Sequence, residues 1–129
     1  KTLYHYISMA EGNYREYLQG EIVRAKKYFY VLRPVLAWRW ILDRGTPPPM
    51  LFSKLIKEEL PIELINPVNQ LLELKMNSSE VKLIKRITEI NEYLDTSIPS
   101  IKSAVRLLDD SHTPEWNKLN QLFLRELMK

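Results

Sequence analysis

The sequence contains no cysteine, two histidines and only three glycines among its 129 residues. Without cysteine, the chain has no disulfide framework, no thiolate zinc site and no cysteine nucleophile. The scarcity of glycine excludes a glycine-rich loop that would cradle a phosphate. The sequence also shows no signal peptide and no apolar run of spanning length, so we expect a cytoplasmic protein that does not contact a membrane.

The composition favours one helical domain. The chain is 45% hydrophobic and 27% charged, which is ordinary for a soluble globular protein. Its eight prolines fall mostly where helices would begin or end, and this favours helices with short connections over sheets. The length suits a single compact domain over residues 1–129. We therefore predict an all-α fold, a bundle of about six helices.

The periodicity of apolar residues predicts where the helices lie. Side chains that recur at threes and fours predict helices over residues 2–19, 51–59, 61–75, 80–94 and 114–128, with a weaker helical piece over 101–108. Residues 95–100 are predicted to form a break, because they contain Pro99.

The bundle is predicted to surround a central kinked helix, from about residue 21 to residue 44. Apolar and aromatic side chains lie on every side of its helical wheel, as in a helix that runs through the middle of a bundle. Pro34 in its middle removes a backbone hydrogen bond and predicts the kink. Residues 22–44 hold six basic side chains and one acidic one, a net charge of +5 in a chain that totals +3. This asymmetry predicts a local anionic partner such as a phosphate.

The cationic and aromatic side chains of this helix form the candidate binding site. Lys26, Tyr30 and Arg33 share one face of the wheel, and Lys27 lies on the next. Either lysine would serve as a point charge for a triphosphate, while Arg33 would supply a bidentate fork. Tyr28 or Tyr30 would hydrogen-bond a phosphate or stack on a base. The equally weighted alternative is a structural core helix whose cations are neutralised or reach solvent.

No residues stand at the spacing of a catalytic or metal-binding site. The acidic pairs at residues 58–59 and 109–110 are expected at helix ends, in contact with solvent. His5 and His112 lie far apart, and no acidic residues accompany them in a pattern typical of a metal site. The chain alone is therefore expected to lack the parts for catalysis.

One spacing indicates a different class of function. Arg106 and His112 are separated by five residues, which fits the loose Arg-x4–6-His pattern of helical ribonucleases of the HEPN class. In that class the arginine and the histidine stabilise and protonate the scissile phosphate. However, Leu107 stands where that motif prefers a polar side chain, and chance supplies such a spacing easily. The ribonuclease hypothesis is the weakest of the alternatives.

A stand-alone protein-interaction module is the stronger alternative. In that case the exposed parts of Tyr28, Trp38 and Trp40 would form a patch on which a partner protein docks.

Several runs of residues resemble a known family. They are YREYL at residues 14–18, KKYFYVLRPVLA at 26–37, WI at 40–41, PPPM at 47–50, LLELK at 71–75 and SE at 79–80. Together they resemble the C-terminal helical half of predicted nucleotidyltransferases of the DNA polymerase β superfamily, the RlaP/YcgL-type proteins. The resemblance covers roughly residues 1–95, and the KKYFYxLRP core is its specific part.

The resemblance implies a longer protein with an N-terminal nucleotidyltransferase domain. In that superfamily, aspartates of that domain hold Mg²⁺ ions that bring an acceptor hydroxyl onto the α-phosphate of a nucleoside triphosphate, NTP. The helical domain closes the cleft and contacts the nucleotide. This chain would then hold no metal and no catalytic residue, and would be inert alone. The acceptor and the nucleotide stay open.

The resemblance also implies roles for single residues. Lys26 or Lys27 would lie near the β- and γ-phosphates, with Tyr30 and Arg33 on the same wall. The further lining residues would be Tyr14, Tyr28, Lys75 and Glu80. Lys75 and Glu80 match family positions without a role that can be assigned, and an ion pair between helices is the favoured alternative for them.

Overall fold

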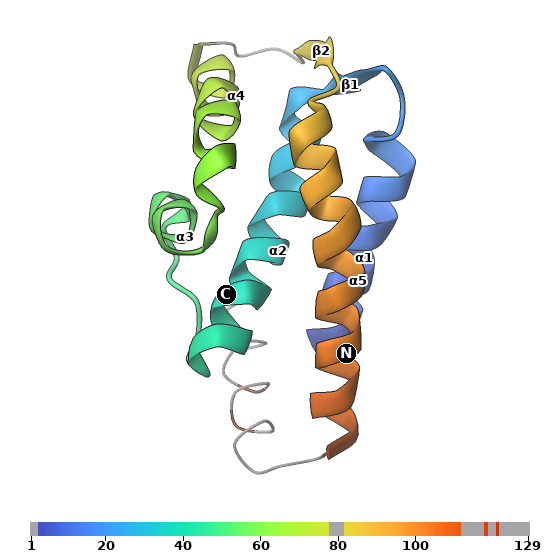
Figure 1. The fold of residues 1–129 in the computed structure, drawn as a ribbon, viewed down its shortest axis with the longest axis vertical. Coiled ribbons are helices and arrows are strands. Elements are labelled where there is room, and N and C mark those ends of the chain that lie inside the picture. Colours follow the sequence, from blue (N-terminus) through green and yellow to red (C-terminus); the bar gives the residue numbers. More distant parts are fainter. Residues whose placement is uncertain (1–2, 78–81, 112–117, 119–120, 122–129) are drawn as a thin grey trace.

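The computed structural model describes residues 3–77, 82–111, 118 and 121. Its elements in chain order are α1 (Leu3–Tyr17), β1 (Ile22–Arg24), α2 (Ala25–Arg44), α3 (Phe52–Glu59), the 3-10 helix η1 (Ile62–Leu64), α4 (Ile65–Asn77), β2 (Leu83–Lys85) and α5 (Thr88–Ser111) (Figure 1). The predicted mostly helical architecture is confirmed. The described residues form five α-helices, one 3-10 turn and a small sheet, so the six-helix bundle is not confirmed. The helix predicted over 114–128 lies almost wholly outside them.

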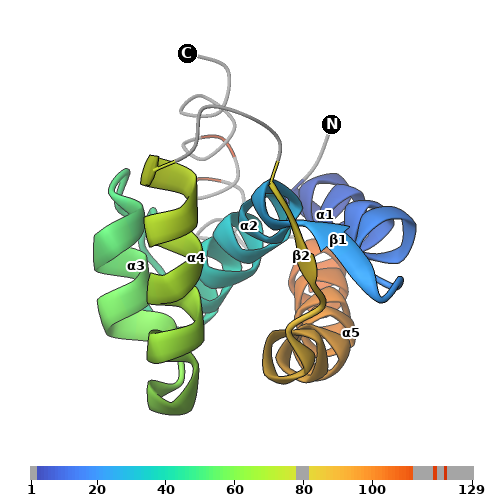
Figure 2. The same ribbon diagram turned by 90° about the horizontal axis from the view of Figure 1, so that it is seen from above.

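Helix α2 is the centre of the fold, as predicted. It lies between α1 and α5 on one side and α3 and α4 on the other (Figures 1 and 2), and it packs against all four. Twelve of its residues are buried, and Tyr28 and Trp38 are completely so. The helix ends at Arg44, as predicted, and Gly45 caps it with a left-handed φ of 67° and an N–H that donates to the Ile41 carbonyl at 2.8 Å.

The two-stranded sheet corrects two predicted helix starts. Strands β1 and β2 are antiparallel, with Ile22 opposite Lys85, Val23 opposite Ile84 and Arg24 opposite Leu83. Because residues 22–24 are extended, α2 begins at Ala25 and not near residue 21. The predicted helix over residues 80–94 is wrong in its first part, since residues 83–85 form a strand and α5 begins only at residue 88.

Helix α5 continues through Pro99, so the predicted break over residues 95–100 is wrong. The piece predicted separately over 101–108 belongs to the same helix. Leu94, Ile98, Ile101 and Val105 recur at threes and fours along α5, and each is at most 2% exposed. The helix packs against α1 and α2. Burial of this stripe offsets the cost of about 3 kcal/mol that a proline imposes inside a helix.

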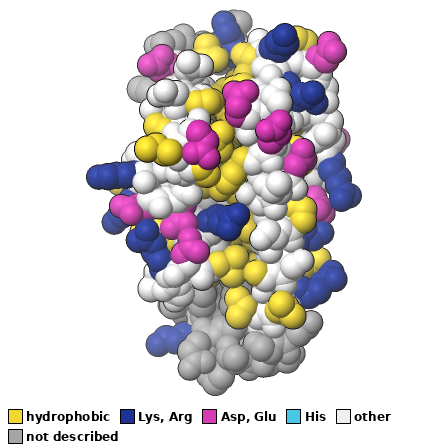
Figure 3. All heavy atoms as spheres, viewed as in Figure 1, with side chains coloured by type: hydrophobic (Ala, Val, Ile, Leu, Met, Phe, Trp, Pro, Cys, Tyr) yellow, Lys and Arg dark blue, Asp and Glu magenta, His cyan; other side chains and the backbone are white. Residues whose placement is uncertain are grey.

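The surface of the described chain mixes apolar and charged side chains. The face that carries α4 and α5 has an apolar stripe along its middle, with acidic side chains beside it (Figure 3). None of the helices within the described ranges combines the length and the apolar character that crossing a bilayer requires.

Candidate functional site

A buried polar network fixes the first turns of α2. The Tyr28 hydroxyl accepts a hydrogen bond from the Ile87 backbone N–H at 2.8 Å and donates one to Asn91 Oδ1 at 2.5 Å. Asn91 Nδ2 donates in turn to the Leu18 carbonyl at 2.7 Å. Since Tyr28 and Asn91 are buried, an unmade bond here would leave a polar group without water. The network therefore positions α2 against the end of α1 and the start of α5.

Tyr14 of α1 joins the same network. Its hydroxyl is shared between the Asn91 carbonyl at 2.9 Å and Asp95 Oδ1 at 2.5 Å. Burial, reinforced by the hydrogen bond to Asp95, raises the pKa of Tyr14 to about 12, and burial also raises the pKa of Tyr28. Both tyrosines were candidate lining residues. They are buried in this network, so neither ring offers a face on which a base would stack.

Three of the candidate residues form what we call the basic row: Lys27, Tyr30 and Arg33. They follow one another at intervals of three along α2, which makes them neighbours on its surface. The Lys27 ammonium lies 4.9 Å from the centroid of the Tyr30 ring and 4.0 Å from that of Tyr17, which comes from α1. Tyr30 is 46% exposed, so its ring and hydroxyl remain available to a ligand.

Arg33 is the last residue of the basic row. Its guanidinium lies 5.0 Å from the centroid of the Phe52 ring of α3, and Nη1 is 3.5 Å from the Met50 carbonyl. Phe52 in turn packs edge-on against Phe29, with centroids 5.8 Å apart. Stacking on an aromatic face orients a guanidinium while its edge stays free to donate hydrogen bonds.

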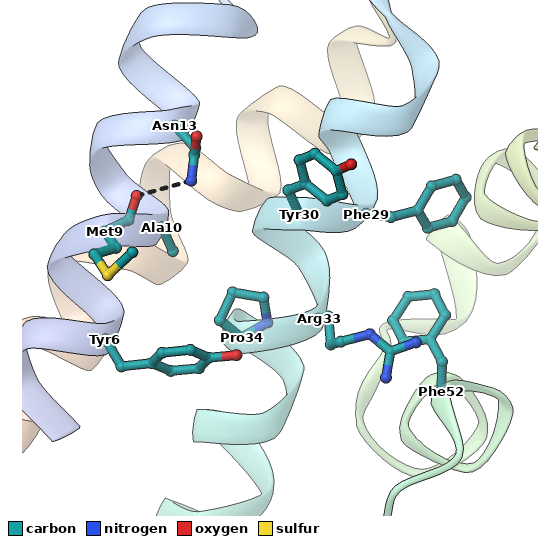
Figure 4. Close-up of a pocket in the computed structure, with 9 residues that line it drawn as sticks. All are labelled: Tyr6, Met9, Ala10, Asn13, Phe29, Tyr30, Arg33, Pro34 and Phe52. Carbon is teal, nitrogen blue, oxygen red and sulfur yellow. Dashed lines mark hydrogen bonds between the residues drawn. The ribbon is translucent and has the colours of Figure 1, made fainter. Parts of the chain in front are cut away.

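Two residues of the basic row, Tyr30 and Arg33, line a hollow of about 390 Å³, and Lys27 lies outside its lining. Its lining comes from Tyr6, Met9, Ala10 and Asn13 of α1, Phe29, Tyr30, Arg33 and Pro34 of α2, and Phe52 of α3 (Figure 4). Helix α1 and helix α2 form its two walls, with Arg33 and Phe52 at one side (Figure 4). Burial raises the pKa of the Tyr6 hydroxyl, and the nearby Arg33 charge lowers it in part. The hollow is thus lined by aromatic and aliphatic side chains, one amide and one guanidinium.

The charge of this site is not neutralised from within. No acidic side chain lines the hollow, and among the described residues neither Lys27 nor Arg33 forms an ion pair. Some cations elsewhere do form ion pairs: Lys102 reaches Glu11 at 2.8 Å, and Arg44 reaches Glu58 at 3.2 Å. Aromatic rings offset only about 0.5–1 kcal/mol of a cation's electrostatic free energy at exposed sites. The basic row therefore keeps its attraction for an anion.

Lys26 lies beside the row without belonging to it. The helical wheel groups Lys26 with Tyr30, but the structure brings Lys27 to that ring, and Lys26 is exposed. Both lysines stand in the first turn of α2, which contains no acidic residue and has no side-chain cap. The helix dipole disfavours cations there by about 0.3–1 kcal/mol each. An anion bound at this end of the helix would interact favourably with both the lysines and the helix dipole, and so would offset that unfavourable free energy.

The tryptophans expected to form a docking patch are inside the fold. Trp38 has no exposed surface and Trp40 is 9% exposed, while Tyr28 is completely buried. Trp40 donates its indole N–H to Thr46 Oγ1 at 3.1 Å. The prediction that these three residues present a protein-binding patch is therefore wrong, because the central helix uses them to fill the core.

The acidic pair at the end of α3 also differs from the prediction of two solvated side chains. The Glu58 side chain is 38% exposed, but that of Glu59 is only 5% exposed and lies 3.4 Å from Nε of Arg44. Burial and the hydrogen bond and charge of Asp43 raise the pKa of Glu59 to about 7, although Arg44 opposes this. The described residues contain no group of three His, Asp or Glu side chains that would hold a metal.

Other candidate residues remain outside the site. The structure does not describe Glu80, His112 or the side chain of Lys75, so the roles proposed for these residues stay predictions. Arg106, the partner of His112 in the ribonuclease hypothesis, donates a hydrogen bond to the Tyr4 hydroxyl at 2.7 Å.

Sequence reasoning did not assign Tyr6, Tyr17 and Phe52 to the site. Tyr17 entered the sequence analysis only through the YREYL run of the family resemblance, and Tyr6 and Phe52 only as residues of predicted helices. Which helix packs beside α2 decides their role, and a single sequence carries no signal for that choice.

Comparison with known proteins identifies the family of the chain. The model of the RlaP family, described as an RNA repair pathway DNA polymerase beta family, matches residues 1–125. The uncharacterized protein YcgL of Bacillus subtilis (strain 168) is 43% identical over 124 residues, which are 95% of this chain and 48% of that protein. The chain thus spans about half the length of this curated relative, and no solved structure matches it. The chain belongs to the RlaP family.

Proposed function

We propose that this chain is the helical domain of a nucleotidyltransferase and forms one wall of its nucleoside triphosphate site. The observation that carries the proposal is the basic row, whose cations have no acidic partner among the described residues and whose Tyr30 and Arg33 line a hollow with several aromatic rings. The family match, to a DNA polymerase beta family, supports it. Transfer of a nucleotidyl group to an acceptor is part of this proposal.

The spacing of the row suits a triphosphate. Lys27 and Arg33 are six residues apart, which is about 9 Å along a helix. Lys27 would bind one phosphate as a point charge, and Arg33 would bind the next with two parallel hydrogen bonds. The Tyr30 ring lies between them in sequence and would donate its hydroxyl proton to a phosphate oxygen or accept the face of the base. Lys26 would add long-range attraction at the helix N-terminus.

The hollow does not fit Mg²⁺. That ion prefers carboxylate and other oxygen ligands, and no carboxylate lines the hollow. We assign the metal and the reacting carboxylates to the part of the full-length protein that this chain does not contain. The contribution of this chain is then to bind and orient the triphosphate.

The test is nucleotide affinity in the full-length protein. Isothermal titration calorimetry with each of the four ribonucleoside triphosphates and Mg²⁺ would compare the natural protein with Lys27→Ala and Arg33→Ala. Removing a charge-assisted hydrogen bond costs about 1.5–3 kcal/mol, so we expect each variant to bind roughly 10-fold to 150-fold more weakly. Lys26→Ala should have a smaller effect because its side chain is outside the row.

Lys54→Ala is the matched control, since Lys54 is exposed on α3 and does not line the hollow. It should leave affinity unchanged. Thermal melting of each variant would show that the fold is kept. Unchanged affinity in both Lys27→Ala and Arg33→Ala, with native melting, would sink the proposal.

A further inference from the structure

The two-stranded sheet presents a basic and apolar outer face. Antiparallel pairing places Ile22, Arg24, Leu83 and Lys85 on one side of the sheet, and the buried Val23 on the other. We call these four residues the sheet face. Ile22 is 61% exposed and Leu83 is 62% exposed, and Arg24 and Lys85 are exposed as well. Basic side chains stand at this end of the molecule in the space-filling view, where β1 and β2 lie (Figures 1 and 3).

The cations of the sheet face lack partners within the part of the chain that the structure describes. There, Arg24 and Lys85 form no ion pair and no side-chain hydrogen bond, whereas Arg44 and Lys102 do. Arg24 and Lys85 are diagonal neighbours in the ladder, a position in which residues lie about 7–8 Å apart. They are close enough to act on successive groups of one chain-like anion.

The sheet face continues into the basic row. Arg24 is the residue directly before α2, and the exposed Lys26 and the half-buried Lys27 follow in its first turn. Four cations therefore follow from the sheet along the start of α2: Lys85, Arg24, Lys26 and Lys27. Lys27 contacts the ring of Tyr30, and Tyr30 lines the hollow. A linear polyanion bound along them would be led with one end toward the proposed triphosphate site.

We propose that the sheet face binds the sugar-phosphate backbone of a single-stranded polynucleotide, the acceptor whose end is brought to the hollow; this rests on the proposed function. Arg24 and Lys85 would contact phosphates, and the exposed aliphatic side chains of Ile22 and Leu83 would pack on riboses or bases. The sheet face carries no aromatic ring for stacking and no amide for base recognition. Binding is therefore independent of sequence.

The favoured occupant follows from this continuity. An acidic protein surface would form ion pairs with Arg24 and Lys85, but it would not explain why the line of cations continues toward the proposed triphosphate site. A polynucleotide carries one negative charge on every nucleotide and ends in a hydroxyl. It therefore matches both the line of four cations and the proposed transfer of a nucleotidyl group to an acceptor hydroxyl.

The experiment measures binding of a fluorescein-labelled single-stranded 12-mer RNA to the full-length protein by fluorescence anisotropy, between 50 and 200 mM KCl. The test variant is Arg24→Gln with Lys85→Gln, which removes two charges and keeps long side chains. The control variant is Lys54→Gln with Lys57→Gln on α3, which removes the same charge at a site away from the sheet face and the basic row.

We expect the test variant to bind the RNA more weakly and the slope of log affinity against log salt to become shallower by about 1.4, because each single-strand phosphate contact contributes about 0.7. The control should keep the natural slope, and oligomers of different base composition should bind alike. An unchanged slope in the test variant, or an equal loss in the control, overturns the proposal. Equal affinity for a polyglutamate peptide of the same charge also overturns it and assigns the face to an acidic protein.

The same preparations separate this inference from the proposed function. Triphosphate affinity should be natural in the sheet variant, because neither substituted residue belongs to the basic row or lines the hollow. Natural triphosphate affinity in Lys27→Ala and Arg33→Ala, together with a shallower RNA slope in the sheet variant, would refute the triphosphate site and keep the polynucleotide site. The opposite pair of results would refute only the polynucleotide site.

Discussion

The Tyr28 hydroxyl is predicted to stabilise the fold more than any exposed tyrosine hydroxyl. It is completely buried, accepts a hydrogen bond from the Ile87 N–H and donates one to Asn91 Oδ1. Tyr28→Phe keeps the ring but leaves both partner groups unsatisfied in the interior. Leaving a buried donor or acceptor without a partner costs about 1–3 kcal/mol. We expect a loss of about 2 kcal/mol in the free energy of unfolding, equivalent to a decrease of roughly 6–10 °C in Tm.

The assay is urea unfolding of the 129-residue chain, followed by circular dichroism, with an unchanged m-value as the sign that only stability has changed. Tyr17→Phe is the matched control. Tyr17 is 38% exposed and Lys27 contacts its ring, which phenylalanine retains, so we expect a change within about 0.5 kcal/mol. Amide hydrogen exchange adds a local readout, because the Ile87 N–H should lose protection in Tyr28→Phe.

A double-mutant cycle then tests the pairing itself. Tyr28→Phe and Asn91→Ala remove the two ends of one hydrogen bond, so their effects should not add, and we expect a coupling of about 0.5–3 kcal/mol. Additive effects would show that the two side chains do not interact. If Tyr28→Phe were as stable as Tyr17→Phe and the Ile87 amide stayed protected, the reasoning that the network anchors α2 would be refuted.

Two further predictions concern a pair of glycines and a buried acid. Gly12 lies inside α1, and a Cβ added there would meet no other atom within 4 Å, so Gly12→Ala should raise the free energy of unfolding by about 0.5–1 kcal/mol. Gly45 has a φ of 67°, which disfavours any side chain, so Gly45→Ala should lower the free energy of unfolding by about 1–2 kcal/mol. Urea unfolding measures both changes, and the same sign for both would contradict this prediction. The pKa of Glu59 is raised from 4.5 to about 7, so its contribution to stability is complete below pH 4.5 and is lost as pH rises toward about 7. In urea unfolding, Glu59→Gln should therefore become more stable relative to the natural chain as pH rises through this range, while Glu58→Gln should not. A stability difference between Glu59→Gln and the natural chain that does not vary with pH would contradict the raised pKa of Glu59.

The long helices could be predicted from sequence because each one carries its own evidence. Periodic apolar residues and Gly45 place α1, α3, α4 and the end of α2 within a few residues of their observed bounds. The sheet could not be predicted, because three residues of alternating burial look the same as one turn of a helix. Pro99 was misleading for a related reason: whether an exposed proline ends α5 depends on how much apolar surface the residues around it bury against α1 and α2.

The candidate site was predictable to the extent that it lies on one helix. Lys27, Tyr30 and Arg33 are all in α2, so their spacing alone indicates that they share a surface. The choice between Lys26 and Lys27 was not predictable, because it is made by Tyr17 of α1, ten residues before Lys27 and on another helix. The Phe52 ring beneath Arg33 likewise depends on how α3 packs.

The first turns of α2 have an anchored inner side and a cationic outer side. On the inner side, Tyr28 is tied to α1 and α5 by hydrogen bonds that leave it little freedom to move. On the outer side, Lys26 and Lys27 stand where the helix dipole opposes a positive charge and where no acidic residue of the first turn compensates. A helix selected only for stability would carry acidic residues at these positions. The rigid inner side fixes the backbone from which both lysines extend, and the rings of Tyr17 and Tyr30 also contact the Lys27 side chain. If the proposed function is right, a bound phosphate would have fewer groups to order, and this preorganisation would strengthen its binding.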